Sequence, residues 1–155
     1  MAAMTYTDLP EIRQKSGRDS YPLVDDFDGF AQGFVGLLAG VLVKWADTVG
    51  IQFIGLLLDF ENSGTGVTDA ADPDVPEGRV NQNGDTLVNL PVAGVTAQTD
   101  VGFAVPVYCA TDNWRTDLSL TPTSNSGPVG WLSRFRAAGR GDVTLFTPEQ
   151  AALQA

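Results

Sequence analysis

Carboxylates are the side chains in this sequence whose spacing could do chemistry. Two acidic groups stand out: Asp25, Asp26 and Asp28 in the stretch DDFDGF, and Asp69, Asp72 and Asp74 in the stretch DAADPDVPEG. Carboxylate oxygens are hard ligands of the kind that Ca²⁺ prefers. Neither group has the spacing of an EF-hand loop, which ends in a bidentate Glu at its twelfth position, so a solvated acidic loop is the simpler interpretation.

Histidine is absent from the sequence, and Cys109 is its single cysteine. The absence of His removes the commonest general base and transition-metal ligand. The sequence also lacks a Walker loop, a GxSxG elbow and a GxGxxG motif after a predicted strand. Cys109 lies in an alternating apolar stretch, which indicates a small buried residue in a reducing compartment and not a nucleophile. We therefore expect a protein that is not an enzyme, with no catalytic residue, metal or cofactor.

A carbohydrate or small-ligand site is the alternative that the acidic groups leave open. The two carboxylates of a glycosidase are recognised by their separation in space, which a sequence does not give. Trp114 and Tyr108 are the aromatic residues that could stack on a sugar, although core or interface positions explain them more simply.

The acidic residues are concentrated in the middle of the chain. The net charge is −10, and residues 21–112 hold thirteen acidic residues against two basic ones, Lys44 and Arg79. A body with this excess repels phosphate backbones, so we expect no nucleic-acid partner. The arginines at 134, 136 and 140 could contact phosphates, but a solvated strand edge explains them as well.

The most apolar stretch, residues 33–60, decides between a membrane span and β-strands. A spanning helix needs about 20 consecutive apolar residues, whereas the first apolar run stops before Lys44 and the next lies beyond Asp47. The stretch alternates with a period of two, which predicts two or three strands with a break near residues 46–50 and no membrane partner. The N-terminus has no apolar core of the kind found in a secretory signal.

Changes in periodicity and the positions of turn-favouring residues divide the chain into three parts. Residues 1–30 show no sustained period, and we expect an extended N-terminal arm. Residues 31–146 form a predicted β-rich body with a long loop at 61–85, in which Asn83 and Gly84 favour a turn. Residues 147–155 predict a short helix, with Thr147 as N-cap, Pro148 at the first position and Gln150 completing a capping box.

Two later stretches alternate clearly and predict half-buried strands. Their apolar faces are Val88, Leu90 and Val92 in the first, and Val101, Phe103, Val105, Val107 and Cys109 in the second. Pro91 and Pro106 cannot donate to a ladder, so we expect an edge or a bulge at each. Short strands separated by turns indicate a mainly β fold, a small single-domain β-barrel or β-tulip-like body.

Residues 86–146 carry a series of motifs in a fixed order. These are Ala93-Gly94-Val95, a Gly-x-x-Val-Tyr strand from Gly102 to Tyr108 with Val105-Pro106 inserted, a Leu-Thr element from Leu118 to Thr121, Val129-Gly130, and a closing strand from Val143 to Leu145. This series resembles the capsid cement, or decoration, proteins of tailed bacteriophages. The apolar residues 33–58 are compatible with the family's opening strands, whereas the N-terminal arm and the 61–85 loop are longer than its pattern.

The resemblance implies a body that binds the outer capsid shell, commonly as a trimer, and braces neighbouring capsomers without catalysis. The expected partners are the major capsid protein and further copies of this chain, on the outer surface of the virion, with assembly in the host cytoplasm. Within the N-terminal arm, Ile12, Arg13, Lys15 and Arg18 are the candidate docking residues. A tail-tube, baseplate or collar protein, or a small-ligand- or carbohydrate-binding barrel, are the alternatives.

Overall fold

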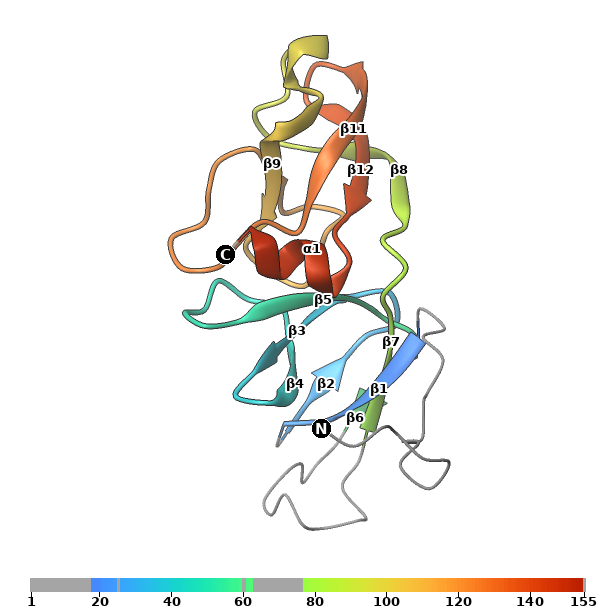
Figure 1. Ribbon diagram of the computed structural model, residues 1–155. Coiled ribbons are helices and arrows are strands. Elements are labelled where there is room, and N and C mark those ends of the chain that lie inside the picture. The colour runs from blue at the N-terminus through green and yellow to red at the C-terminus, as the bar shows by residue number, and fades with distance from the viewer. Residues whose placement is uncertain (1–17, 25, 60, 63–76, 155) are drawn as a thin grey trace, which may run out of the picture.

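Two five-stranded antiparallel sheets make up most of the molecule, and one short helix lies where they meet (Figure 1). The computed structural model describes residues 18–24, 26–59, 61–62 and 77–154. The first sheet forms one end of the molecule and the second sheet forms the other, as the blue-to-green and green-to-red halves of the ribbon show. The fold is therefore mainly β, as the sequence predicted.

The first sheet has the strand order β1-β7-β5-β3-β4. Its strands are β1 (Arg18–Pro22), β3 (Phe34–Leu38), β4 (Val41–Lys44), β5 (Gln52–Leu57) and β7 (Glu77–Asn81). Two short strands, β2 (Asp28–Gly29) and β6 (Glu61–Asn62), pair with each other beside it. The expected strands in residues 33–60 and the break near 46–50 are confirmed, and none of the helices in the described part of the chain is long and apolar enough to span a membrane.

The second sheet has the strand order β10-β9-β11-β12-β8. Its strands are β8 (Thr86–Pro91), β9 (Gly102–Cys109), β10 (Leu118–Ser119), β11 (Gly130–Ala137) and β12 (Arg140–Leu145), with a 3₁₀ turn, η2 (Gln98–Asp100), between the first two. Residues 82–85 connect the sheets. The chain bends at Asn83, and Gly84 has φ +71°, but this segment crosses from one sheet to the other and forms no hairpin turn.

Both sheets follow the same circuit. Suppose that the five strands of each sheet are numbered one to five in chain order. The order of the strands across the sheet is then 1-5-4-2-3 in both sheets. In each sheet a short parallel bridge then joins the residues just after the first strand to the third strand, through Leu23 and Leu42 in one and Ala93 and Ser119 in the other. These bridges join the two edges of each sheet, and one of the two sheets curls into a half-barrel.

The hydrophobic core has two parts. The larger part joins the two sheets, because it contains Phe34 and Phe53 of the first sheet together with Leu132 and Val143 of the second. The smaller part fills the inside of the first sheet and contains Leu23, Phe27, Val35, Leu42, Ile54, Leu57 and Val80. The shared core makes the two sheets one packed body.

Part of the expected N-terminal arm is instead folded. Residues 18–22 form β1, which pairs with β7 in register from Arg18 opposite Asn81 to Pro22 opposite Glu77. Leu23 and Phe27 are buried in the smaller core. The prediction of an arm was therefore wrong for residues 18–30, because the apolar residues there are too few and too irregularly spaced to show a period. Residues 1–17 lie outside the described residues.

The expected loop at 61–85 is also partly folded, since β6 occupies its start and β7 occupies residues 77–81. Gly78 and Arg79 interrupt any apolar alternation in β7, yet the strand is central and pairs with both β1 and β5. Residues 63–76 lie outside the described residues.

The C-terminal helix α1 (Pro148–Leu153) begins as predicted. The Thr147 hydroxyl accepts a hydrogen bond from the backbone N–H of Gln150, whose side chain accepts one from the backbone N–H of Thr147. Ala151 is buried, and the helix lies against β5 (Figure 1). The helix follows the last strand of the second sheet, so its packing on β5 connects the C-terminal segment to the first sheet.

The predicted strand faces hold only where the ladders are regular. Leu90, Val107 and Cys109 are buried as expected, but Val88 and Phe103 are 60% and 63% exposed. The ladder between β8 and β12 shifts register close to Val88, and the ladder between β9 and β11 passes from Pro106 directly to Gly102, so residues 103–105 bulge out. A bulge inserts unpaired residues and reverses the face that follows. Pro91 in an edge strand and Pro106 beside a bulge agree with the prediction.

Candidate functional site

The candidate capsid-docking residues and the two acidic groups lie largely outside the described part of the chain. Ile12, Arg13 and Lys15 belong to residues 1–17, and Arg18 opens β1. Most of the two acidic groups also lies outside the described residues, namely Asp25, Asp69, Asp72 and Asp74. Asp28 forms a salt bridge with Lys44 at 3.3 Å, and no group of three metal-ligating side chains occurs within the described ranges.

Cys109 is fully buried in β9, as the sequence predicted. Burial raises the pKa of its thiol to about 12, so the thiol is protonated at neutral pH. Because the thiolate is the reactive form, Cys109 is chemically inert here.

The two aromatic residues named as possible sugar-stacking residues have different surroundings. Trp114 is half-buried against Phe34, and its indole N–H donates to the carbonyl of Gln32 at 2.6 Å. The guanidinium of Arg115 lies 5.2 Å from the centre of the Trp114 ring and covers its face. Tyr108 lines a different cavity from those that Trp114 borders.

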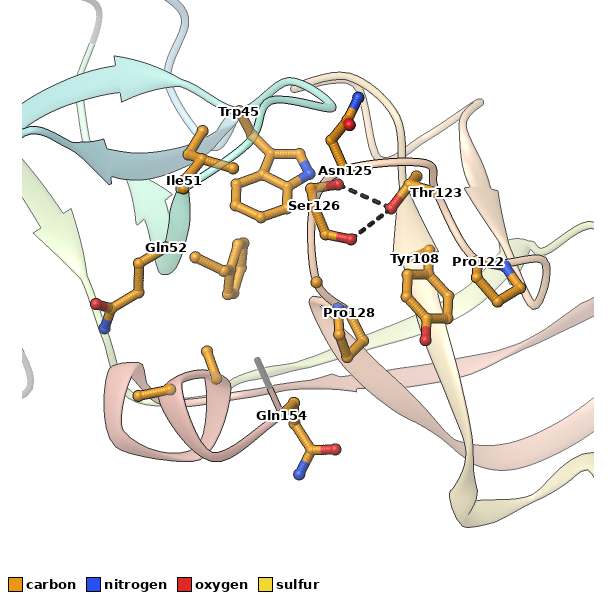
Figure 2. A pocket seen from close by; sticks show the side chains of 15 residues that line it. Trp45, Ile51, Gln52, Tyr108, Pro122, Thr123, Asn125, Ser126, Pro128 and Gln154 are labelled. Carbon is orange, nitrogen blue, oxygen red and sulfur yellow. Dashed lines mark hydrogen bonds between the residues drawn. The ribbon is translucent and has the colours of Figure 1, made fainter.

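This cavity lies at the junction of the two sheets and has a volume of about 610 Å³ (Figure 2). The first sheet contributes residues around β5, the second contributes Tyr108 and the loop 122–128, and α1 supplies the floor. Its apolar walls include Ile51, Phe53 and Pro128. None of its lining residues is charged, although the chain has a net charge of −10.

The loop 122–128 is held in place from the opposite sheet. One carboxylate, that of Asp47 in the turn before β5, accepts hydrogen bonds from the backbone N–H groups of Ser124, Asn125 and Ser126 at 3.1, 2.7 and 2.8 Å. These hydrogen bonds lower the pKa of Asp47 below its ordinary value of 3.8, with the bond from Ser126 contributing most. We call this arrangement the Asp47 clasp.

A second contact across the junction fixes the neighbouring wall. The indole N–H of Trp45 donates to the carbonyl of Cys109 at 2.6 Å, and the Trp45 ring meets that of Phe53 edge-on at 5.4 Å. Both contacts are buried, so this wall of the cavity is fixed by the core.

A separate feature is a group of exposed and half-buried side chains on the second sheet, among which Trp131 also packs against the larger core. The ring of Phe103, on the bulge of β9, lies 4.4 Å from the half-buried ring of Trp131 on β11. Val88 is the exposed apolar residue on edge strand β8 of the same sheet. We call Phe103, Trp131 and Val88, together with the arginines of the β11–β12 hairpin, the outer face.

The hairpin places three arginines, 134, 136 and 140, near one another on neighbouring strands. Arg136 makes a two-pronged ion pair with the buried Asp142, with both N–O distances at 2.9 Å. This pair lowers the pKa of Asp142, so the carboxylate stays charged. Arg140 donates to the side chain and carbonyl of Asn89 at 3.1 and 2.7 Å. The guanidinium groups of Arg136 and Arg140 are thus positioned by the fold.

Sequence reasoning did not find the loop 122–128, the Asp47 clasp or the outer face. The loop has no period, and the clasp joins residues about 78 positions apart. The outer face depends on bulges that alternation does not reveal. A signal was present in the sequence, because Trp131 is followed closely by the arginines at 134, 136 and 140.

Comparison with protein families, with curated proteins and with solved structures finds no match to this chain.

Proposed function

We propose that this protein is a structural component of a phage virion that decorates the outer capsid surface and braces neighbouring capsomers. The observation that carries the proposal is the outer face of the second sheet, where Phe103 is 63% exposed and stacked on Trp131 beside three arginines. Trp and Arg are the residues most enriched at binding hot spots, and Phe at interface cores. The sequence resemblance of residues 86–146 to capsid cement proteins supports the same function.

The role needs binding and rigidity but no chemistry. A protein that binds an assembled shell and not its free subunits stabilises the shell by linkage. A body fixed by a shared core and the Asp47 clasp loses little conformational freedom on binding, so little of the contact energy is spent on ordering. Several copies attached to one lattice further strengthen weak individual contacts.

The charge of the outer face indicates the character of its partner. The β11–β12 hairpin carries three arginines against one aspartate, in a chain with ten negative charges in excess. Complementary charge steers association and fixes orientation. We therefore propose that the outer face contacts an acidic surface of the major capsid protein, and that copies of this chain associate as a trimer.

Co-sedimentation tests this function. Purified protein is mixed with undecorated, expanded shells of the same virus at micromolar concentration, and the shells are then pelleted. We expect the protein in the pellet, and its retention in the supernatant would refute the proposal.

A matched pair of variants tests the outer face. Phe103→Ala is expected to weaken binding at least tenfold, about 1.4 kcal/mol, because it removes a stacked aromatic ring from the contact. Phe30→Ala is the control, since Phe30 is also 63% exposed but belongs to the half of the chain that forms the first sheet. Equal binding by both variants would remove the outer face from the proposal.

A further inference from the structure

The cavity at the junction of the two sheets is a second site, distinct from the outer face. Its volume of about 610 Å³ falls in the range of small-molecule sites, roughly 300–1,000 Å³. We propose that this cavity binds a small neutral saccharide. This activity goes beyond capsid binding and does not depend on it.

The lining explains why the ligand is neutral. It contains aromatic, aliphatic, hydroxyl and amide side chains and no Asp, Glu, Lys or Arg. A charged ligand would lose its hydration on entering and would find no opposite charge to compensate. A neutral ligand avoids this cost.

The polar groups of the lining explain why the ligand carries hydroxyl groups. The hydroxyl of Tyr108 and the side-chain amides of Asn125 and Gln154 make no hydrogen bond to any described residue, although all three line the cavity (Figure 2). An amide offers both donors and an acceptor, and a phenol offers one of each, so each group can bond a sugar hydroxyl. Asn125 and Gln154 are exposed and lie at opposite ends of the lining in Figure 2, so they would contact different parts of the ligand. The apolar walls at Ile51, Phe53 and Pro128 suit the C–H faces of a sugar ring.

The backbone around the cavity disfavours a peptide ligand. Extended peptides are commonly bound by adding a strand to an open sheet edge. The strand that lines this cavity, β5, is a central strand with β7 on one side and β3 on the other. The β5 residues that line the cavity, Gln52 and Phe53, pair with β3 in the described ladders, and α1 packs against the same strand, so the side chains of the lining provide most of the recognition.

Binding at this site requires little rearrangement. The Asp47 clasp fixes the loop that carries Asn125 and Gly127, and Trp45 is fixed by its hydrogen bond to Cys109. Preformed walls reduce the ordering cost of binding, so even a small sugar can be held.

The test is a titration followed by two-dimensional ¹H–¹⁵N NMR. The neutral probes are glucose, N-acetylglucosamine, maltose and cellobiose, and the comparison probes are glucose 6-phosphate and a neutral proline-rich peptide. We expect at least one neutral sugar to give saturable shifts at residues 122–128 and 151–154, with a Kd on the order of 1 mM. We expect the phosphorylated sugar to bind at least fivefold more weakly.

Two variants locate the site. Gly127 lines the cavity, and a Cβ added there would meet no atom within 4 Å, so Gly127→Leu fills the space without disturbing the fold. Gly127→Leu is expected to abolish the shifts and Asn125→Ala to weaken binding at least threefold. Asn83→Ala, at an exposed asparagine outside the cavity, is expected to bind like the wild type.

Three results would overturn the proposal: no saturable shift with any neutral sugar, preferential binding of the peptide, or binding that survives Gly127→Leu. Gly127→Leu is expected to co-sediment with shells as the wild type does. Failure of sugar binding and failure of capsid binding are therefore observed separately.

Discussion

The two sheets share one strand circuit but differ in regularity, and this difference determines which of them presents a binding surface. Within the described residues, the ladders of the first sheet have one register shift, beside Gly36, whereas those of the second have four. The regular sheet turns its apolar residues inward around a core of its own. The irregular sheet turns Phe103 and Val88 outward. The two sheets have the same strand order, so the bulges explain why the second sheet exposes apolar side chains and the first sheet buries them.

The two halves of the chain also differ in charge. Residues 1–85 contain fourteen acidic and five basic residues, whereas residues 86–155 contain five and four. The half with the outer face is therefore nearly neutral. Neutrality reduces the repulsion that an acidic partner would otherwise meet, and this agrees with the outer face as the contact surface.

The largest expected effect comes from the core that joins the sheets. Phe53→Ala removes a buried ring that meets Phe34 and Trp45 edge-on at 5.1 and 5.4 Å, and should lower the free energy of unfolding by about 3–5 kcal/mol. Because both sheets share this core, we expect one unfolding transition by circular dichroism and tryptophan fluorescence. Two separate transitions would show that the sheets are independent. Phe103→Ala, at an exposed ring, is the control with little effect on stability.

A smaller effect tests the equivalence of the two circuits. Gly55 in β5 and Gly130 in β11 each lie on the fourth strand of their own sheet. A Cβ added to Gly55 would lie 2.2 Å from the carbonyl oxygen of Asn81 on the fifth strand, and a Cβ added to Gly130 would lie 2.4 Å from that of Thr144. Either glycine-to-alanine change should cost roughly 2–4 kcal/mol through overpacking. Gly55→Ala should cost more, because Gly55 also has φ +140°. Equal costs in denaturant titrations would contradict that order. Gly127→Ala, in open space, is the control.

The smallest effect concerns the Asp47 clasp and depends on pH. The folded protein holds the pKa of Asp47 below 3.8, so its contribution is present above that value and is lost as the pH falls through the lowered pKa. The protection of the amides at residues 124–126, measured relative to their intrinsic exchange rates, should fall in the wild type as the pH drops below 3.8. In Asp47→Asn this protection should be low at neutral pH and respond less to acid. Protection in the variant that matches the wild type at pH 7 would show that the carboxylate does not hold the loop.

Local sequence signals predicted the regular elements well. Alternation located the strands between Gly33 and Phe60, and the Thr147, Pro148 and Gln150 pattern located the start of α1. These signals act over a few residues, and the structure satisfies them without help from distant parts of the chain. The buried position of Cys109 followed from the same alternation.

Long-range features could not be predicted in this way. Strand β1 is held by pairing with a strand about 60 residues away, and its own residues carry no period. The exposure of Phe103 depends on a register shift in a ladder with β11, and the cavity depends on three segments that meet only in the fold. Of the cavity's lining, Tyr108 alone was named in advance as an aromatic that could contact a ligand. The loop 122–128, which supplies the hydrogen-bonding side chain of Asn125, showed no sequence pattern that would have predicted a site.

The connection between the sheets, residues 82–85, is the single crossing from one complete circuit to the other. A break in the peptide backbone at this point would leave every ladder of both circuits intact. The two fragments could then associate through the hydrophobic core that the two sheets share, as the fragments of a split protein do.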